Sequence, residues 1–256
     1  MDWSALYLFE LILMRVSGFI FTNPLFGRSN LPNLAKAGMA MAFTVFVWGS
    51  DGTAVTPPAT IIELAVRLAL ELVVGATLSF VMYLFFAVVQ VGGEAIDAQM
   101  GLNMAQVYDA SSQMNMTLTA SLLQVLLILT FFAANGHYTL LRILLSSGAV
   151  VPYGSAVVGE AVASGIAEVF LGCMVLAIQL ALPILAAELL GEVAMGILMK
   201  AIPQINAFVI NMELKVIIGL VLLLVFLTPI NEFLLGVEAN MLDTVSQVLR
   251  IIAGAS

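Results

Sequence analysis

The chain has 256 residues, of which 62% are hydrophobic and 9% are charged, and its formal net charge at pH 7 is −8. Soluble globular domains carry about a quarter charged residues, so this composition excludes a soluble domain and predicts an integral membrane protein. The negative charge argues against binding to nucleic acid or to anionic lipid surfaces, and the single cysteine, Cys173, excludes an internal disulfide.

The first apolar run, Trp3 to Phe21, is interrupted by Glu10 and Arg15. The hydrophobic part of a secretory signal carries no charge and ends at a small-residue cleavage site, so we expect this segment to be retained. Asn23-Pro24 should end its helix, because the residue before a proline is displaced from helical backbone angles. Asn30-Leu31-Pro32 is predicted to start the second helix, because proline is tolerated in a first turn.

The later apolar runs have unequal lengths, whereas a helix needs about 20 residues to cross the hydrocarbon core of a membrane. Ile61–Val91 and Ala161–Leu190 exceed that length, and Pro183 predicts a kink in the second of them. The other runs are mostly shorter: Leu34–Trp48, Leu118–Ala134, Tyr138–Val151, Val193–Ala201, Ile205–Ile210, Val216–Leu227 and Phe233–Ile252. This mixture predicts one all-α membrane domain, residues 1–256, with long kinked helices and helical hairpins packed against other protein.

Ionisable residues occur inside several of these runs. Glu63, Arg67 and Glu71 are spaced by four, so they would be neighbours on a helix and can pair. They fit either a solvated first turn beyond the bilayer or a contact with a partner helix. Arg15 and Glu168 lie deeper in their runs, where charged side chains face protein or water rather than lipid. Since the chain offers few partners for them, these charges predict partners on other chains.

A polar stretch, Gly92 to Thr117, separates two apolar runs and contains no Lys or Arg. Its methionines are adaptable side chains that seal against irregular surfaces, and Gly92, Gly93 and Gly101 allow tight passage of the backbone. Irregular backbone at membrane depth is tolerated where protein surrounds it or where it lines a watery path. The stretch is therefore either an ordinary surface loop or a flexible plug that closes a channel and can be displaced.

The sequence lacks the usual motifs of catalysis and metal binding. His137 is the only histidine, whereas a zinc site takes three or four Cys, His or carboxylate ligands. No G-x-S-x-G, H-E-x-x-H or Walker pattern occurs. Asp97 and Asp109 could form an intramembrane acid pair, but nothing in the sequence fixes their separation. We expect no enzyme activity, no metal and no cofactor, and we expect His137 to cap a turn in which Gly136 adopts a left-handed backbone.

Short motifs along nearly the whole chain resemble those of one known family in their order and spacing. The strongest runs from Gly93 through Glu94 and Asp97 to Leu102, followed by Asp109, Asn115 and Met116. The others are Arg15-Val16, Asn23-Pro24, Leu31-Pro32, Lys36, Asn135-Gly136-His137, Val151-Pro152-Tyr153-Gly154, Leu182-Pro183, and Pro203-Gln204 with Phe208-Val209-Ile210. The chain resembles the FliR/SctT family of type III secretion export-gate subunits.

The resemblance implies a non-enzymatic subunit of the flagellar type III protein export gate, in the bacterial inner membrane at the flagellar basal body. Members of the family assemble with FliP and FliQ into a closed helical spiral, and FlhB and FlhA are further expected partners. Unfolded flagellar proteins are the expected cargo. The resemblance also divides the chain into a FliP-like portion, residues 1–190, and a FliQ-like hairpin portion, residues 191–256.

Two sets of candidate site residues follow. By similarity, the pore plug is the loop Gly101 to Thr117, with Gly101, Leu102, Asn103, Met104, Gln106, Tyr108, Asp109, Gln113, Met114, Asn115 and Met116 as its main residues. The candidates for contacts with other subunits are Arg15, Glu63, Arg67, Glu71, Glu94, Asp97, Lys200 and Gln204.

Three rival functions remain at this stage. The chain could be a passive scaffold that orders neighbouring subunits without closing a channel. It could be a secondary transporter, with Pro183 and the glycines of the polar stretch marking broken helices, although no inverted repeat is visible. An intramembrane hydrolase would require His137 for activity.

Overall fold

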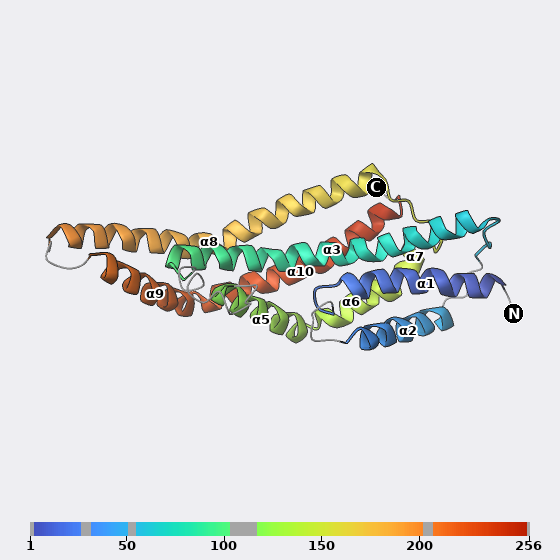
Figure 1. Cartoon of the computed structure of the whole chain (residues 1–256), viewed down its shortest axis with the longest axis horizontal. Helices are drawn as coiled ribbons and strands as arrows, with labels where there is room; N and C mark the ends of the chain where they lie inside the picture. Colours follow the sequence, from blue (N-terminus) through green and yellow to red (C-terminus); the bar gives the residue numbers. More distant parts are fainter. Residues whose placement is uncertain (1–2, 27–31, 51–54, 103–116, 202–206, 255–256) are drawn as a thin grey trace. The chain divides into compact units, whose positions relative to one another are not determined.

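The computed structural model describes residues 3–26, 32–50, 55–102, 117–201 and 207–254, and it confirms an all-α membrane protein (Figure 1). The first helices are α1 (Trp3–Thr22), α2 (Asn33–Ser50) and α3 (Ile61–Met100). The remaining helices are α5 (Leu118–Ala133), α6 (Gly136–Leu145), α7 (Ser147–Val150), α8 (Glu160–Ala201), α9 (Ala207–Val225) and α10 (Leu227–Ile252).

Within the described ranges, α1, α3 and α8 are each long and apolar enough to cross a membrane, and counting the bent pairs α5–α6 and α9–α10 as one span each gives five. Helix α3 has 40 residues and α8 has 42. At 1.5 Å per residue each is about 60 Å long, roughly twice the thickness of the hydrocarbon core. The prediction of overlong helices is therefore confirmed, and both extend further than the apolar runs indicated.

Helix α3 continues through the start of the polar stretch and ends at Met100. The prediction of a loop beginning at Gly92 is therefore wrong for Gly92 to Met100. Gly92 and Gly93 have a helical backbone, and their lack of a side chain lets neighbouring helices pack closely. A Cβ atom added at Gly93 would lie 2.4 Å from the Cα of Ala120, and one at Gly92 would lie 3.2 Å from the carbonyl oxygen of Ala177.

The ends of the first two helices lie where the proline signals predicted them. Helix α1 ends at Thr22, and the side-chain oxygen of Asn23 accepts a hydrogen bond of 2.9 Å from the amide of Leu25. This hydrogen bond closes a local turn around Pro24. Helix α2 begins directly after Pro32, whose carbonyl accepts hydrogen bonds from the amides of Ala35 and Lys36.

The turn between α5 and α6 differs from the prediction in one residue. Asn135 adopts the left-handed conformation, with φ of 60°, whereas Gly136 is the first residue of α6. Asparagine is one of the few residues other than glycine that adopts this conformation readily. The expected role of Gly136 is therefore wrong, and His137 lies in the first turn of α6.

Helix α10 is amphipathic, whereas the sequence predicts an apolar run over Phe233–Ile252. Its buried side chains recur every three or four residues, the spacing of one helix face: Ile230, Leu234, Val237, Met241, Val245, Val248 and Ile252. The opposite side carries exposed polar residues, including Asn240, Asp243, Gln247 and Arg250. Most of α10 thus packs against protein on one face and presents polar groups on the other.

The chain divides into two compact units, which share α3, α8 and α10. Unit 1 comprises Met1–Phe85, Asn135–Leu171 and Ala239–Ser256, and unit 2 comprises Phe86–Ala134 and Gly172–Glu238. In unit 1, α1 packs against α2 and touches α3 at two reciprocal glycines. A Cβ at Gly75 would lie 2.0 Å from the carbonyl oxygen of Arg15, and one at Gly18 would lie 2.3 Å from that of Leu72.

Candidate functional site

The C-terminus of α3 is closed by a Schellman motif. The amide of Leu102 donates to the carbonyl of Asp97 at 3.0 Å, and the amide of Gly101 donates to the carbonyl of Ala98 at 3.3 Å. This pair of bonds satisfies carbonyls that a helix end leaves without partners, and it requires a left-handed residue directly after the helix. Gly101 meets that requirement with φ of 78°. The glycine therefore fixes where the polar stretch leaves α3.

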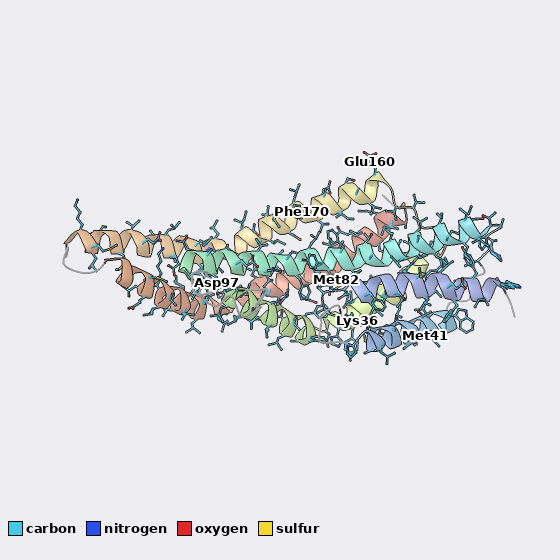
Figure 2. The ribbon with its side chains drawn as sticks, viewed as in Figure 1. Lys36, Met41, Met82, Asp97, Glu160 and Phe170 are labelled. Carbon is cyan, nitrogen blue, oxygen red and sulfur yellow. The ribbon has the colours of Figure 1, made fainter. Side chains whose placement is uncertain are left out.

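The N-terminus of α5 is capped by a side chain from α3. Both carboxylate oxygens of Asp97 accept hydrogen bonds from Thr119, one from its amide at 2.7 Å and one from its hydroxyl. Figure 2 shows Asp97 near the end of α3. The first amides of a helix have no partners within it, and an anion at that end interacts favourably with the helix dipole. Asp97, a residue of α3, thus accepts a hydrogen bond from an amide at the start of α5 that has no partner within its own helix.

Close packing in unit 2 surrounds this contact. Gly93 touches the backbone of Ala120, and Gly92 touches Leu180 of α8. Met100 is fully buried, and its side chain fills the space beside Gly219 of α9. At Gly92, Gly93 and Gly219, atoms of the neighbouring helix occupy the space that a side chain would need. Only glycine therefore allows the helices to lie this close together. The end of α3 is therefore held from several directions.

The predicted plug lies largely beyond this anchor. Gly101 and Leu102 form the turn after α3. The other predicted plug residues lie outside the described residues: Asn103, Met104, Gln106, Tyr108, Asp109, Gln113, Met114, Asn115 and Met116. The described part of the chain resumes at Thr117, just before α5. The two described ends of the stretch thus lie at one contact between α3 and α5.

The candidates for contacts between subunits fall into two groups. Arg67 pairs with Glu63 within α3, as the spacing of four predicted, and both side chains keep exposed surface. Glu94 is partly buried and accepts a hydrogen bond of 2.9 Å from Gln90. Lys200 is exposed in the last turn of α8, and Gln204 lies outside the described residues. The remaining three, Arg15, Glu71 and Asp97, have no exposed side-chain surface.

Arg15 finds its partners inside unit 1. Its Nε donates to Glu71 at 2.6 Å, and both side chains have 0% exposed surface. Its Nη1 donates to the carbonyl of Val151 at 3.0 Å and to the hydroxyl of Ser147 at 3.3 Å. The guanidinium carbon lies 4.3 Å from the ring centroid of Tyr153, within the range of a cation–π contact.

The other carboxylate oxygen of Glu71 accepts a hydrogen bond of 2.8 Å from the amide of Gly154. The pair therefore joins α1 and α3 to the turn that follows α7. The prediction of partners for Arg15 on other chains is wrong for the ion pair, because Glu71 belongs to the same chain. The motif Val151-Pro152-Tyr153-Gly154 was identified in the sequence, but its distance along the chain concealed this contact.

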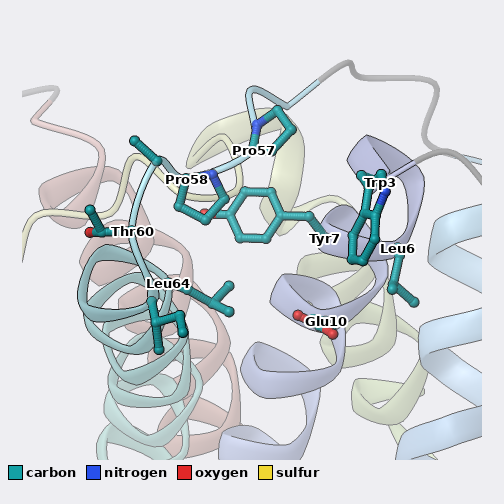
Figure 3. A pocket seen from close by; sticks show the side chains of 10 residues that line it. Trp3, Leu6, Tyr7, Glu10, Pro57, Pro58, Thr60 and Leu64 are labelled. Atoms are coloured by element: carbon teal, nitrogen blue, oxygen red, sulfur yellow. The ribbon is translucent and has the colours of Figure 1, made fainter.

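A pocket of about 370 Å³ opens in unit 1 between the start of α1 and the segment before α3 (Figure 3). Figure 3 shows the ring of Tyr7 directed toward Pro58. The lining residues are Trp3, Leu6, Tyr7, Glu10, Pro57, Pro58, Ala59, Thr60, Ile61 and Leu64. None of these was a candidate site residue.

Across the described ranges, no group of three His, Cys, Asp or Glu residues is arranged to hold a metal ion.

The carboxylates of Asp97 and Glu71 hold neighbouring backbone segments in position. Asp97 uses both carboxylate oxygens on one threonine, and Glu71 uses both of its own on Arg15 and Gly154. Both oxygens of each carboxylate thus serve contacts within the chain. The strongest candidate site is therefore the contact of Asp97 with Thr119, where the polar stretch leaves and re-enters the helices.

Comparison with known proteins gives one consistent result. The family described as "Bacterial export proteins, family 1" matches residues 6–240. The flagellar biosynthetic protein FliR of Bacillus subtilis (strain 168) is 29% identical over 248 residues, covering 95% of both chains. FliR of Escherichia coli (strain K12) is 30% identical over 259 residues, covering 98% of this chain and 97% of that relative. FliR of Aquifex aeolicus (strain VF5) is 25% identical and covers 89% of both chains.

Proposed function

The chain belongs to family 1 of the bacterial export proteins, the family of flagellar biosynthetic protein FliR, and we propose that it is a subunit of the flagellar type III export gate. In this role it helps to form and to close the channel through which unfolded flagellar proteins leave the cell. The gate would lie in the bacterial inner membrane at the flagellar basal body. The family assignment and the membrane-length helices support this proposal.

The helix surfaces favour a subunit surrounded by other proteins. Large apolar side chains are exposed on α8 and α9, among them Leu171, Leu182, Leu190, Ile197, Leu224 and Val225. One of these helices, α8, is about twice as long as the hydrocarbon core is thick. Lipid alone cannot cover such a length, so partner helices are needed for the remainder. We propose FliP and FliQ as these partners, with FlhB and FlhA nearby.

The proposed division of the chain follows from the same partnership. Residues 1–190 would be the FliP-like portion, and residues 191–256 would be the FliQ-like hairpin portion. The boundary falls within α8, and α8 and α9 meet beyond it through an ion pair between Glu192 and Lys215. A side chain at Gly191 would touch Ile218. These contacts support a helical hairpin in the second portion.

The closing role is proposed for residues 101–117. The single observation that carries it is that a polar stretch inside a membrane protein has both described ends bonded to one residue, Asp97. A segment tethered in this way can occupy a pore without being lost from it when the pore opens. We propose no catalytic step and no cofactor for this chain, and energy for export would come from other components.

Co-purification tests the assembly part of the proposal. The tagged chain should be expressed together with FliP and FliQ, extracted in mild detergent and weighed as an intact particle. A large complex containing all three proteins is expected. A particle containing this chain alone, despite expression of both partners, would contradict the gate and favour a transporter that works by itself.

A further inference from the structure

One wall of the pocket in unit 1 is a single stripe of α1. Trp3, Tyr7 and Glu10 all line the pocket, and their spacing of four and three residues places them on one helix face. Figure 3 shows these three side chains on α1 and those of Pro58 and Leu64 on the other side. Glu10 lies about 10 Å along α1 from Trp3. The wall therefore presents two aromatic rings and, beyond them, a carboxylate.

Glu10 has no partner within the chain. Among the described residues that line the pocket, it is the one with a charged side chain. Its partly buried carboxylate makes no ion pair or hydrogen bond within the part of the chain that the structure describes. The charges of Glu63 and Arg67, beside the pocket on α3, neutralise each other. The pocket thus keeps a net negative charge, and burial of that charge is costly unless a cation pairs with it.

The other wall of the pocket, the segment before α3, is rigid. The rings of Pro57 and Pro58 fix the backbone angle φ at both residues. The hydroxyl of Thr60 accepts a hydrogen bond of 3.2 Å from the amide of Glu63. The carboxylate of Glu63 in turn accepts one of 3.1 Å from the amide of Ala59, in the manner of a capping box. A pocket with walls already fixed loses little entropy when it is filled, which favours binding.

The lining suits a cation on an aliphatic stem. Leu6 and Leu64 offer apolar surface to the stem. The rings of Trp3 and Tyr7 attract a cation, and the carboxylate of Glu10 can accept a charge-assisted hydrogen bond from it.

Other acceptors in the pocket are already engaged. The hydroxyl of Tyr7 accepts a hydrogen bond of 3.5 Å from Arg67, and the hydroxyl of Thr60 accepts the one from Glu63. An ammonium group has fewer N–H donors to satisfy than a guanidinium group. The shortage of acceptors therefore favours a lysine side chain over an arginine side chain.

The rim of the pocket indicates that the amine comes from a protein. Trp3 and Ile61 line the pocket although their exposed fractions are 78% and 85%, and apolar surface of this kind marks contacts with other macromolecules. An aminophospholipid carries its amine close to a phosphate, so a second anion would have to enter the apolar pocket beside Glu10. Lysine carries its charge on a four-carbon stem without such an anion.

We propose that this pocket binds a lysine side chain of a neighbouring subunit, whose ammonium group pairs with Glu10 and lies against the rings of Trp3 and Tyr7. This inference rests on the proposed function, because it requires a complex of several proteins. It adds a specific contact, at the start of α1, by which another subunit is held.

Carbodiimide cross-linking of the co-purified complex tests the proposal, because this reagent joins a carboxylate to an amine that touches it. Digestion and mass spectrometry then identify the amine joined to Glu10. The expected product joins Glu10 to a lysine of another subunit, and Glu10→Gln should abolish it. A product with phosphatidylethanolamine, a product with a lysine of this chain, or no product of Glu10 in the intact complex would overturn the proposal.

The rate at which the cross-linked subunit leaves the complex, measured without the reagent, gives a second readout. Glu10→Gln should raise this rate about tenfold, as expected when a hydrogen bond to a charged group is lost. Glu10→Asp keeps the charge and should raise it less. Glu160→Gln is the control, since it removes an exposed carboxylate elsewhere in unit 1, and it should leave the rate unchanged.

Replacement of the identified lysine by methionine should raise the rate as Glu10→Gln does. The two changes together should add little, because each removes the same contact. Fully additive effects would overturn the pairing. Failure of the parent chain to co-purify with any partner rejects the proposed function as well, whereas an intact complex that Glu10→Gln leaves unchanged rejects the lysine contact alone.

Discussion

Arg15 and Glu71 form an ion pair of 2.6 Å in which neither side chain has any exposed surface. The pair lies beside a close contact of α1 and α3, because Gly75 touches the carbonyl of Arg15 itself. The backbones of Val151 and Gly154 make further hydrogen bonds to the pair, whereas Nη2 of Arg15 is buried and has no hydrogen-bond partner among the described residues. A buried ion pair stabilises a fold only when its geometry and its further hydrogen bonds offset the cost of desolvation. Here one chain supplies the ion pair and three further hydrogen bonds, which offset part of that cost.

Arg15→Met should destabilise the protein strongly, because it leaves Glu71 buried without its cation. Breaking a buried pair from one side costs about 3–5 kcal/mol. Thermal unfolding of the purified complex would show this as a lower midpoint. The double variant Arg15→Met with Glu71→Leu should recover a large part of the loss, since no unpaired charge remains. A single variant as stable as the parent would show that the pair is not needed.

Gly75→Ala should separate α1 from α3. Its new Cβ would lie 2.0 Å from the carbonyl oxygen of Arg15, a backbone atom that cannot move by itself. Overpacking of this kind costs about 1–3 kcal/mol or more. Gly172→Ala in α8 is the matched control, because nothing lies within 4 Å of the added atom. The yield of folded complex should fall for the first variant and stay constant for the second, and equal yields would contradict the packing argument.

Gly101→Ala tests the turn that ends α3. The added methyl group meets nothing within 4 Å, but the backbone at this residue has φ of 78°. A left-handed residue other than glycine costs about 1–2 kcal/mol, so the stability of the complex should fall by that amount. Gly101→Asn should cost less, because asparagine tolerates this conformation better. If alanine and asparagine lower the stability equally, the left-handed backbone at residue 101 is not the cause of the loss.

Glu63 and Arg67 allow the proposed contact between subunits to be tested without touching the buried pair. Both are partly exposed and pair with each other, and an exposed pair contributes about 0–1 kcal/mol to stability. The double variant Glu63→Ala, Arg67→Ala should therefore leave the fold of the chain intact. If these residues bind a neighbouring subunit, less FliP and FliQ should co-purify. Normal recovery of both partners would show that the contact is not required.

Local signals in the sequence were sufficient where a single residue determines the backbone. Asn23-Pro24 ends α1, and Pro32 directly precedes α2. Composition was sufficient to identify a membrane protein, and the lengths of the apolar runs indicated its helices. In each case the cause lies within a few residues of the effect, so no knowledge of the tertiary fold was needed.

The sequence was insufficient where the cause lies in another helix. Gly92 and Gly93 resemble loop residues until Ala177 and Ala120 are seen packed against them. Asp97 resembles a free charge until Thr119 is placed beside it. In the α5–α6 turn, two adjacent residues could both adopt the left-handed conformation, and the sequence did not distinguish Asn135 from Gly136.

The central claim is that this chain closes an export channel with residues 101–117. The most direct test compares ion conductance of the complete complex in planar bilayers before and after deletion of Tyr108 to Met114, with equal recovery of both complexes confirmed beforehand. The account predicts a closed parent complex and a steady ion leak in the deletion. Equal, low conductance in both would contradict it and would leave the chain as a scaffold that orders its neighbours.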